Sequence, residues 1–119
     1  MLETMGDLTD LLKPPAVAQP VMLLSGGDPV ARLTLRATEY PWIEYEFMPF
    51  DKWRELGEAV KVFSLSARQG MEGVRLRMKA NDSLDLVLAS DDGLVTTRDF
   101  LLHVRGDRAH VRSFNRESI

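Results

Sequence analysis

Apolar and polar residues alternate along two neighbouring segments of the chain, and this alternation predicts β-strands. The period of two extends over residues 30–37 and again over residues 42–48. Such a period places successive side chains on opposite faces of a sheet. We therefore predict two antiparallel strands joined by a loop at residues 40 and 41, preceded by a shorter strand over 21–24. Together these first strands occupy residues 21–48.

Apolar residues recur at spacings of three and four in two other segments, which predicts helices. Residues 1–13 fit a short N-terminal amphipathic helix, and the Pro- and Ala-rich residues 14–20 fit an extended linker. Asp51 is a typical N-cap residue, so the next segment predicts a longer central helix over 51–69 that ends at Gly70. Its apolar face would carry Trp53, Leu56, Val60 and Phe63. The second half of this segment also fits a strand, because Val and Phe favour β-structure.

The rest of the chain, residues 74–114, has the pattern of an antiparallel meander. Apolar and basic residues alternate over residues 74–79, and Asp92-Gly93 is typical of a tight hairpin turn. We predict a single α+β domain spanning residues 1–119. It would contain a mostly antiparallel sheet of about six to seven strands, with the short N-terminal helix and the longer central helix packed on it.

The last predicted hairpin has a register that follows from its turn. If Gly106 and Asp107 are the two turn residues, then His103 faces His110 on the neighbouring strand. The only two histidines of the chain then lie beside three arginines, on the face opposite the core. We call this candidate binding site the basic face, and it consists of His103, Arg105, Arg108, His110 and Arg112, with Leu101 beside them.

Three interpretations of the basic face remain open. Guanidinium and imidazole groups suit a carboxylate or phosphate ligand. A metal is disfavoured because only two nitrogen ligands lie amid positive charge, so we expect neither a metal nor a cofactor. In the third interpretation the arginines are solvated and pair with aspartates or with another chain. Like charges opposite one another destabilise a hairpin, which favours an acidic partner.

The strand over residues 42–48 has a second unusual face. Its residues opposite the core are Trp42, Glu44, Glu46 and Met48. Apolar side chains beside carboxylates suit a sheet covered by a helix, a ligand groove or a dimer interface. Two carboxylates at this spacing can also act together as acid and base. No His, Ser or metal motif accompanies them, so we name these residues as interface candidates and assign no catalytic residue.

Composition removes several classes of function. The chain has 119 residues, no cysteine and a net charge of -3. The missing cysteines exclude a disulfide scaffold, a Cys-based zinc site and a thiol nucleophile. The acidic balance disfavours nucleic-acid and membrane-surface binding. The first residues lack the basic and apolar regions of a signal peptide, and no apolar run is long enough to span a membrane. We therefore expect a cytoplasmic protein.

The aromatic strand that follows Tyr40-Pro41 and the ending Phe100-Leu101-Leu102-His103-Val104 resemble a group of short uncharacterised bacterial proteins. The resemblance covers about the last two thirds of the chain. It implies a bacterial, cytoplasmic, free-standing domain, and it implies no activity, cofactor or catalytic residue.

The distribution of charge leads to our functional hypothesis. Residues 1–60 carry 5 basic and 10 acidic side chains, net -5, whereas residues 61–119 carry 10 and 8, net +2. This asymmetry favours a non-enzymatic protein that binds a protein partner or forms a homodimer through complementary sheet faces. The alternative is a protein or enzyme that binds a small anionic ligand on the basic face. A nucleic-acid accessory role for residues 98–116 is the weaker third hypothesis.

Overall fold

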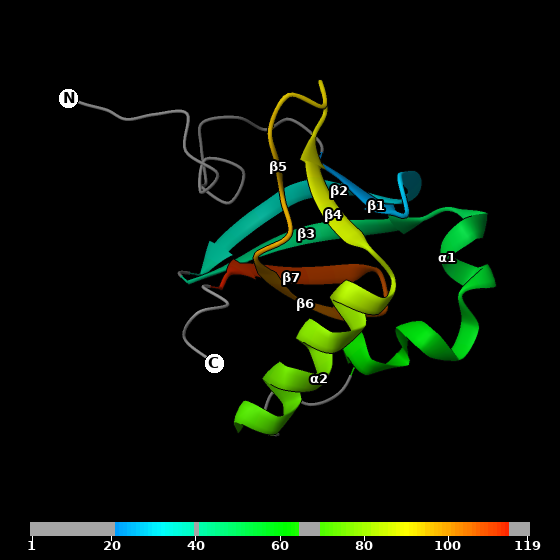
Figure 1. The fold of residues 1–119 in the computed structure, drawn as a ribbon. Helices are drawn as coiled ribbons and strands as arrows, with labels where there is room; N and C mark the ends of the chain where they lie inside the picture. The colour runs from blue at the N-terminus through cyan, green and yellow to red at the C-terminus, as the bar shows by residue number, and fades with distance from the viewer. Residues whose placement is uncertain (1–20, 40, 65–69, 115–119) are drawn as a thin grey trace.

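The fold is a single antiparallel sheet that curls around its core, with helical segments at its open side (Figure 1). The computed structural model describes residues 21–39, 41–64 and 70–114. The helix and linker predicted over residues 1–20 therefore lie outside the described residues. The strands are β1 Val21–Ser25, β2 Asp28–Glu39, β3 Trp42–Pro49, β4 Leu86–Ser90, β5 Thr96–Thr97, β6 Phe100–Arg105 and β7 Arg108–Ser113. Their order across the sheet is β5-β4-β1-β2-β3-β7-β6. The predicted α+β class with antiparallel pairing is confirmed.

The connection between β5 and β6 shows how strongly the sheet curls. These strands lie at opposite edges of the sheet, yet only residues 98 and 99 separate them in sequence. The three Cα steps from Thr97 to Phe100 span at most about 11 Å. The two edges must therefore approach each other, which turns the sheet into a half-barrel. Residues 97 and 100 accordingly belong to two different strands rather than to one.

The core lies on the inner face of this half-barrel. Ile43, Tyr45 and Phe47 of β3 are each 3–4% exposed, as their alternation predicts. The alternation over residues 30–37 predicts that Ala31, Leu33, Leu35 and Ala37 share the inner face of β2, and this is correct for Ala31 and Leu33, which are buried. A register irregularity between Leu35 and Ala37 interrupts the pairing with β3, and Ala37 is exposed. A bulge of this kind shifts the alternation, because one extra residue reverses the faces that follow it.

Over residues 51–64 the predicted central helix is instead two short segments, and its last part, residues 65–69, lies outside the described residues. The α-helix α1 spans Asp51–Glu55 and the 3-10 helix η2 spans Gly57–Ser64. Gly57 separates them with a left-handed φ of 58°, which an uninterrupted α-helix excludes. Asp51 is the first helical residue rather than the N-cap, and no side chain caps this helix. The predicted apolar face is nevertheless correct in its burial. Trp53 and Phe63 belong to the core, and Leu56 and Val60 pack against it.

Gly57 allows a direct test of this break. We expect Gly57→Ala to lower the free energy of unfolding by about 1 kcal/mol, because a Cβ is unfavourable at positive φ. A Cβ at this position would meet no atom within 4 Å, so the cost would come from the backbone alone. Urea unfolding measures the change. Gly57→Asn is the control and should cost less, because Asn tolerates this conformation. An alanine variant as stable as the wild type would contradict the break.

The helix α2, Gly70–Ser83, replaces the strand predicted over residues 74–79. Gly70 begins this helix rather than ending the previous one. The buried positions Gly73, Arg77 and Asn81 recur every four residues, which is helical spacing, whereas Leu76 is 43% exposed. Two of these buried residues, Arg77 and Asn81, are polar. A pattern based on apolar residues alone therefore does not show the helical period.

Asn81 joins α2 to the sheet edge. Its side-chain amide is 1% exposed and donates a hydrogen bond to the carbonyl oxygen of Phe100, with an N–O distance of 2.9 Å. This bond satisfies a backbone group on the outer edge of β6, an edge that would otherwise be free to pair with another strand. Together with β5, α2 interrupts the meander predicted over residues 74–114. None of the helices in the described ranges is long and apolar enough to cross a membrane.

Candidate functional site

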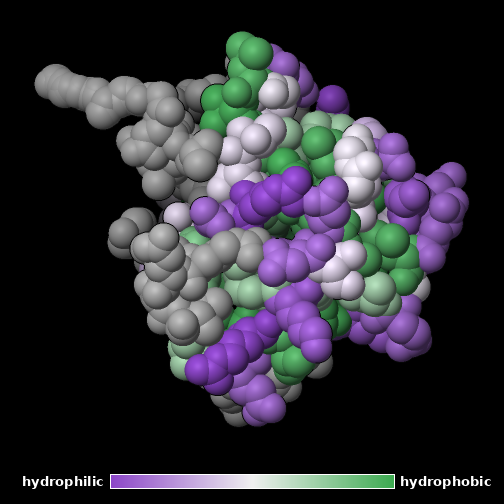
Figure 2. All heavy atoms as spheres, in the orientation of Figure 1, coloured by the Kyte–Doolittle hydropathy of each residue, from purple (hydrophilic) through white to green (hydrophobic). Residues whose placement is uncertain are grey.

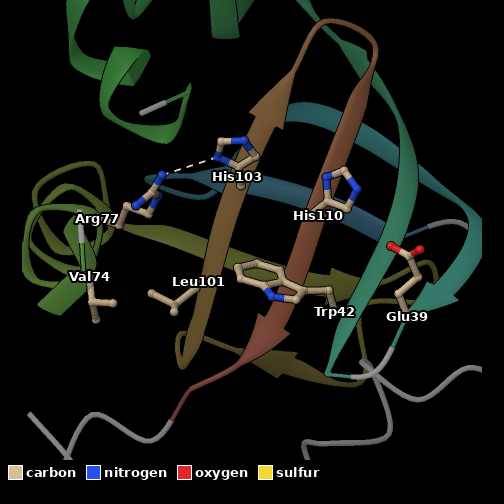
Figure 3. Close-up of a pocket in the computed structure, with 8 residues that line it drawn as sticks. Glu39, Trp42, Val74, Arg77, Leu101, His103 and His110 are labelled. Atoms are coloured by element: carbon tan, nitrogen blue, oxygen red, sulfur yellow. Dashed lines mark hydrogen bonds between the residues drawn. The ribbon is translucent and has the colours of Figure 1, made fainter. Parts of the chain in front are cut away.

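A cavity of about 220 Å³ opens on the outer face of the sheet, between the first half of α2 and strands β3, β7 and β6 (Figure 3). Its wall is mostly apolar. In Figure 3 the Trp42 indole extends from β3 across β7 toward Leu101, which faces Val74 of α2. The complete lining consists of Glu39, Trp42, Gly70, Val74, Arg77, Leu101, His103 and His110. The cavity thus combines an apolar floor with one guanidinium and two imidazole side chains.

The terminal hairpin has the register that its turn predicts. His103 pairs with His110, Leu101 with Arg112, and Arg105 with Arg108. The predicted core face is also correct, since Phe100, Leu102, Val104, Ala109 and Val111 are all buried. Leu101 was expected on a surface face but is only 5% exposed, because it lies beside α2.

The basic face divides into residues inside and outside the cavity. Only His103 and His110 line the cavity. Arg105 is exposed near the turn, and Arg108 lies against acidic side chains. The Arg112 guanidinium lies 5.8 Å from the centre of the Trp42 ring, a cation–π distance. The cationic side chain that does line the cavity is Arg77, which our sequence analysis did not identify. The sequence signal for this residue was the helical spacing of four that joins Gly73, Arg77 and Asn81.

Glu44 is the centre of an ion-pair cluster beside the cavity. Its Oε2 lies 3.4 Å from Arg36 Nε and 3.3 Å from Arg108 Nε. Its Oε1 lies 3.5 Å from His110 Nε2. These side chains are 23–44% exposed, so each pair contributes at most about 1 kcal/mol to stability. The cluster places His110 and two arginines around one carboxylate.

The acidic and basic faces meet within one chain, because β3 and β7 are neighbours in the sheet. Glu44 pairs with His110 and Glu46 with Arg108 in the strand register. Ion pairs inside the sheet therefore compensate part of the opposite charges that suggested a dimer. Neither glutamate lines the cavity, which gives no support to an acid–base pair formed by these two carboxylates.

The four interface candidates of β3 do not form one patch. Trp42 lies at the cavity, while Met48 pairs with Arg32 near the other end of the strand and is 51% exposed. Six residue steps along the strand separate them by about 20 Å. On the face viewed in Figure 2, hydrophobic residues form small areas between polar and charged ones.

Arg77 reaches the cavity from α2 and is only 5% exposed. Its Nη2 lies 3.3 Å from Nδ1 of His103, the contact drawn as a dashed line in Figure 3. Its Nη1 lies 3.5 Å from the carbonyl oxygen of Gly73. Desolvation by burial lowers the pKa of the Arg77 guanidinium. Burial thus holds this cationic side chain of the cavity wall away from bulk water.

His103 and His110 lie side by side across the hairpin. Their ring centres are 6.3 Å apart and the rings are inclined by 43°. The Nδ1 atom of His110 is buried and has no hydrogen-bond partner in the part of the chain that the structure describes. Among these same described residues, no three His, Asp or Glu side chains gather closely enough to hold a metal ion.

Comparison with known proteins adds no family to this picture. No protein-family model, no curated protein and no solved structure matches the chain. The resemblance to short bacterial proteins therefore remains a prediction. Function has to be argued from the cavity itself.

Proposed function

We propose that this protein binds a small organic monoanion, with its apolar ring against Trp42, Leu101 and Val74 and its carboxylate at Arg77. The observation that carries this proposal is the buried guanidinium in the wall of a mostly apolar cavity. A carboxylate in the cavity could accept charge-assisted hydrogen bonds from this guanidinium, and such bonds are stronger than those between neutral groups.

The volume of the cavity sets the size of the ligand. A protein cavity of about 150 Å³ holds benzene. The volume of about 220 Å³ thus suits one six-membered ring with a few attached atoms. Trp42 supplies an aromatic surface on which a flat ring can pack.

The charges around the cavity favour a single negative charge on the ligand. Arg77 is the one cation among the lining residues, and Glu39 lies on the opposite side (Figure 3). A dianion such as phosphate would meet repulsion from Glu39 and would lose more hydration in the apolar cavity. A monocarboxylate meets less repulsion from Glu39 and loses less hydration than a dianion does.

Thermal unfolding with benzoate as the probe tests this proposal. At ten times its Kd, benzoate should stabilise the folded protein by about 1.4 kcal/mol, which corresponds to a rise in Tm of roughly 5 °C. We expect Arg77→Met to abolish the rise. Arg75→Met is the matched control on the exposed side of α2 and should retain it.

A second variant addresses the risk that Arg77→Met fails to fold. Val74→Phe fills the cavity from the same helix and leaves its charges unchanged, so it should also remove the rise in Tm. A wild-type protein whose Tm does not respond to benzoate or to cyclohexanecarboxylate would contradict the proposal.

The alternative of a protein-interaction module keeps less support than it had from sequence. Its motive was charge complementarity, and Glu44 now has Arg36, Arg108 and His110 as partners within the chain. A protein partner or homodimer stays a prediction, which light scattering at low salt can test.

A further inference from the structure

We propose that the loop between β4 and β5 docks in the cavity of a second copy of this chain, and that Leu94 is the side chain that enters the cavity. The loop consists of residues 91–95. The contact joins two different surfaces, and it differs from the strand-face dimer predicted from sequence. It uses the cavity of the proposed function but does not depend on a ligand there.

Leu94 is the most exposed large apolar side chain among the described residues. It is 83% exposed, whereas the next, Met48, is 51% exposed. In Figure 1 the β4–β5 loop extends beyond the sheet, at the end of the molecule opposite the first half of α2, which lines the cavity. The leucine therefore cannot reach the cavity of its own chain. Only another molecule can cover it.

Hydrogen bonds within the loop fix the position of Leu94. The Asp92 Oδ1 atom accepts from the Ser90 hydroxyl at 2.6 Å and from the backbone N–H of Leu94 at 2.9 Å. The Ser90 hydroxyl also accepts from the backbone N–H of Val95 at 3.1 Å, and the Val95 carbonyl accepts from the N–H of Ser90 at 2.9 Å. A single exposed leucine is common on protein surfaces, but this one lies on an ordered loop. An ordered loop loses less conformational freedom on docking, which favours the contact.

The loop presents the chemistry that we propose for a small ligand of the cavity. Leu94 supplies an apolar side chain, and the hydrogen bond to its N–H holds the Asp92 carboxylate next to it. The hydrogen bonds from Ser90 and Leu94 also lower the pKa of Asp92, so this carboxylate is charged at neutral pH. An apolar group beside one carboxylate therefore stands ready on the surface of every copy.

The cavity accommodates a leucine side chain. Its volume is about 220 Å³, and a cavity of about 150 Å³ already holds the six carbon atoms of benzene. The side chain of leucine has four carbon atoms. Trp42, Val74 and Leu101 give the wall its apolar surface. A surface pocket that receives an apolar side chain from a different surface of the next molecule joins the two in a heterologous contact.

The charges of the two surfaces favour a second copy as the occupant. The loop contains Asp91 and Asp92 and no basic residue. On the cavity side, Arg77 lies in the wall and Arg112 lies beside the indole that lines it, whereas Glu39 is the one acidic residue of the lining. Opposite charges steer the loop toward this cavity. An acidic loop would be repelled by nucleic acid or by an anionic membrane surface.

Sedimentation equilibrium of the full chain at low salt tests the contact. One loop buries less than the area of about 1,200 Å² at which stable specific interfaces begin. We therefore expect weak association, to be measured at protein concentrations up to about 1 mM. Leu94→Ala should weaken the association about tenfold, because most of the inserted apolar side chain is lost.

Leu76→Ala is the matched control for this variant. Leu76 is 43% exposed on α2 and is not among the residues that line the cavity, so its replacement should leave the association unchanged. A wild-type protein that stays monomeric up to the highest concentration would overturn the inference. Equal association of the wild type and Leu94→Ala would overturn it too.

A mixture of two variants tests which surfaces meet. Leu94→Ala keeps the cavity and lacks the leucine, whereas Val74→Phe keeps the loop and fills the cavity. Each variant alone should associate about tenfold less than the wild type. Their equimolar mixture should regain the contact but form one-to-one complexes only, because each complex has one loop and one cavity to use. A mixture that associates no better than its components would overturn the pairing of loop and cavity.

Benzoate separates this inference from the proposed function and does not require Val74→Phe to fold. At a concentration that raises the Tm of the wild type, benzoate should dissociate the assemblies, because benzoate and Leu94 compete for one cavity. Association that persists while benzoate is bound would overturn the inference and leave the proposed function intact. If benzoate does not bind but the two variants pair on mixing, the proposed function fails and this inference stands.

Discussion

Replacement of Phe63 by alanine is expected to lower the free energy of unfolding by about 3–5 kcal/mol. Phe63 is the only fully buried side chain of η2 and has 0% exposure. Its ring centre lies 6.1 Å from that of Trp53, which in turn packs edge-on against Phe47 at 5.1 Å. Removal of the ring would leave a void between η2, α1 and β3. The surrounding sheet is paired on both sides of β3 and can collapse only partly into that void.

Urea unfolding followed by tryptophan fluorescence measures this loss, because Trp53 contacts the altered position. Ser64→Ala is the matched control, since Ser64 is the exposed neighbour of Phe63 on η2. It should change stability by less than about 0.5 kcal/mol. A Phe63→Ala variant within 1 kcal/mol of the wild type would show that η2 does not complete the core.

Ionisation of Tyr45 alone is expected to lower the free energy of unfolding by roughly 2–3 kcal/mol when the pH rises from 9 to above 12. Tyr45 is 3% exposed, and burial raises its pKa from 10 to about 12. In the unfolded chain the phenol ionises near pH 10, whereas in the folded protein it stays neutral until about pH 12. Between these values the unfolded state binds fewer protons, so stability falls as pH rises. Below pH 10 the contribution of Tyr45 is fully present.

Tyr45→Phe isolates this contribution, because lysines and arginines titrate equally in both proteins. The wild type should lose about 2–3 kcal/mol more stability than the variant over this pH range. The difference between the two alkaline absorbance titrations should place the ionisation of Tyr45 near pH 12. Parallel stability curves for the two proteins, or an ordinary midpoint near pH 10, would show that the phenol is not buried.

Local patterns were sufficient where neighbouring segments pair through a short turn. The β6–β7 register follows from two residues, Gly106 and Asp107, because a two-residue turn leaves one arrangement of the flanking strands. The same reasoning placed His103 beside His110. Alternation in β3 also predicted its buried face, since one side of that strand packs on the core.

Local patterns failed where polar residues are buried by long-range contacts. The amide of Asn81 is buried because it binds the Phe100 carbonyl on an edge strand, and Arg77 is buried against His103. Neither partner is close in sequence, so a helix with a polar buried side looked like a strand with alternating charges. The break at Gly57 was missed for a related reason, because the apolar spacing continues across it.

The sequence by itself determined which residues face the core in β3, how the terminal hairpin pairs, and that the two histidines lie together. These properties depend on side-chain period and turn geometry, which act over a few residues. Only the tertiary structure decided that the acidic and basic strands are neighbours, that α2 covers the edge of β6, and that Arg77 completes a cavity at the histidines. Those outcomes depend on contacts between segments that are far apart in the sequence, which local period and turn geometry do not specify.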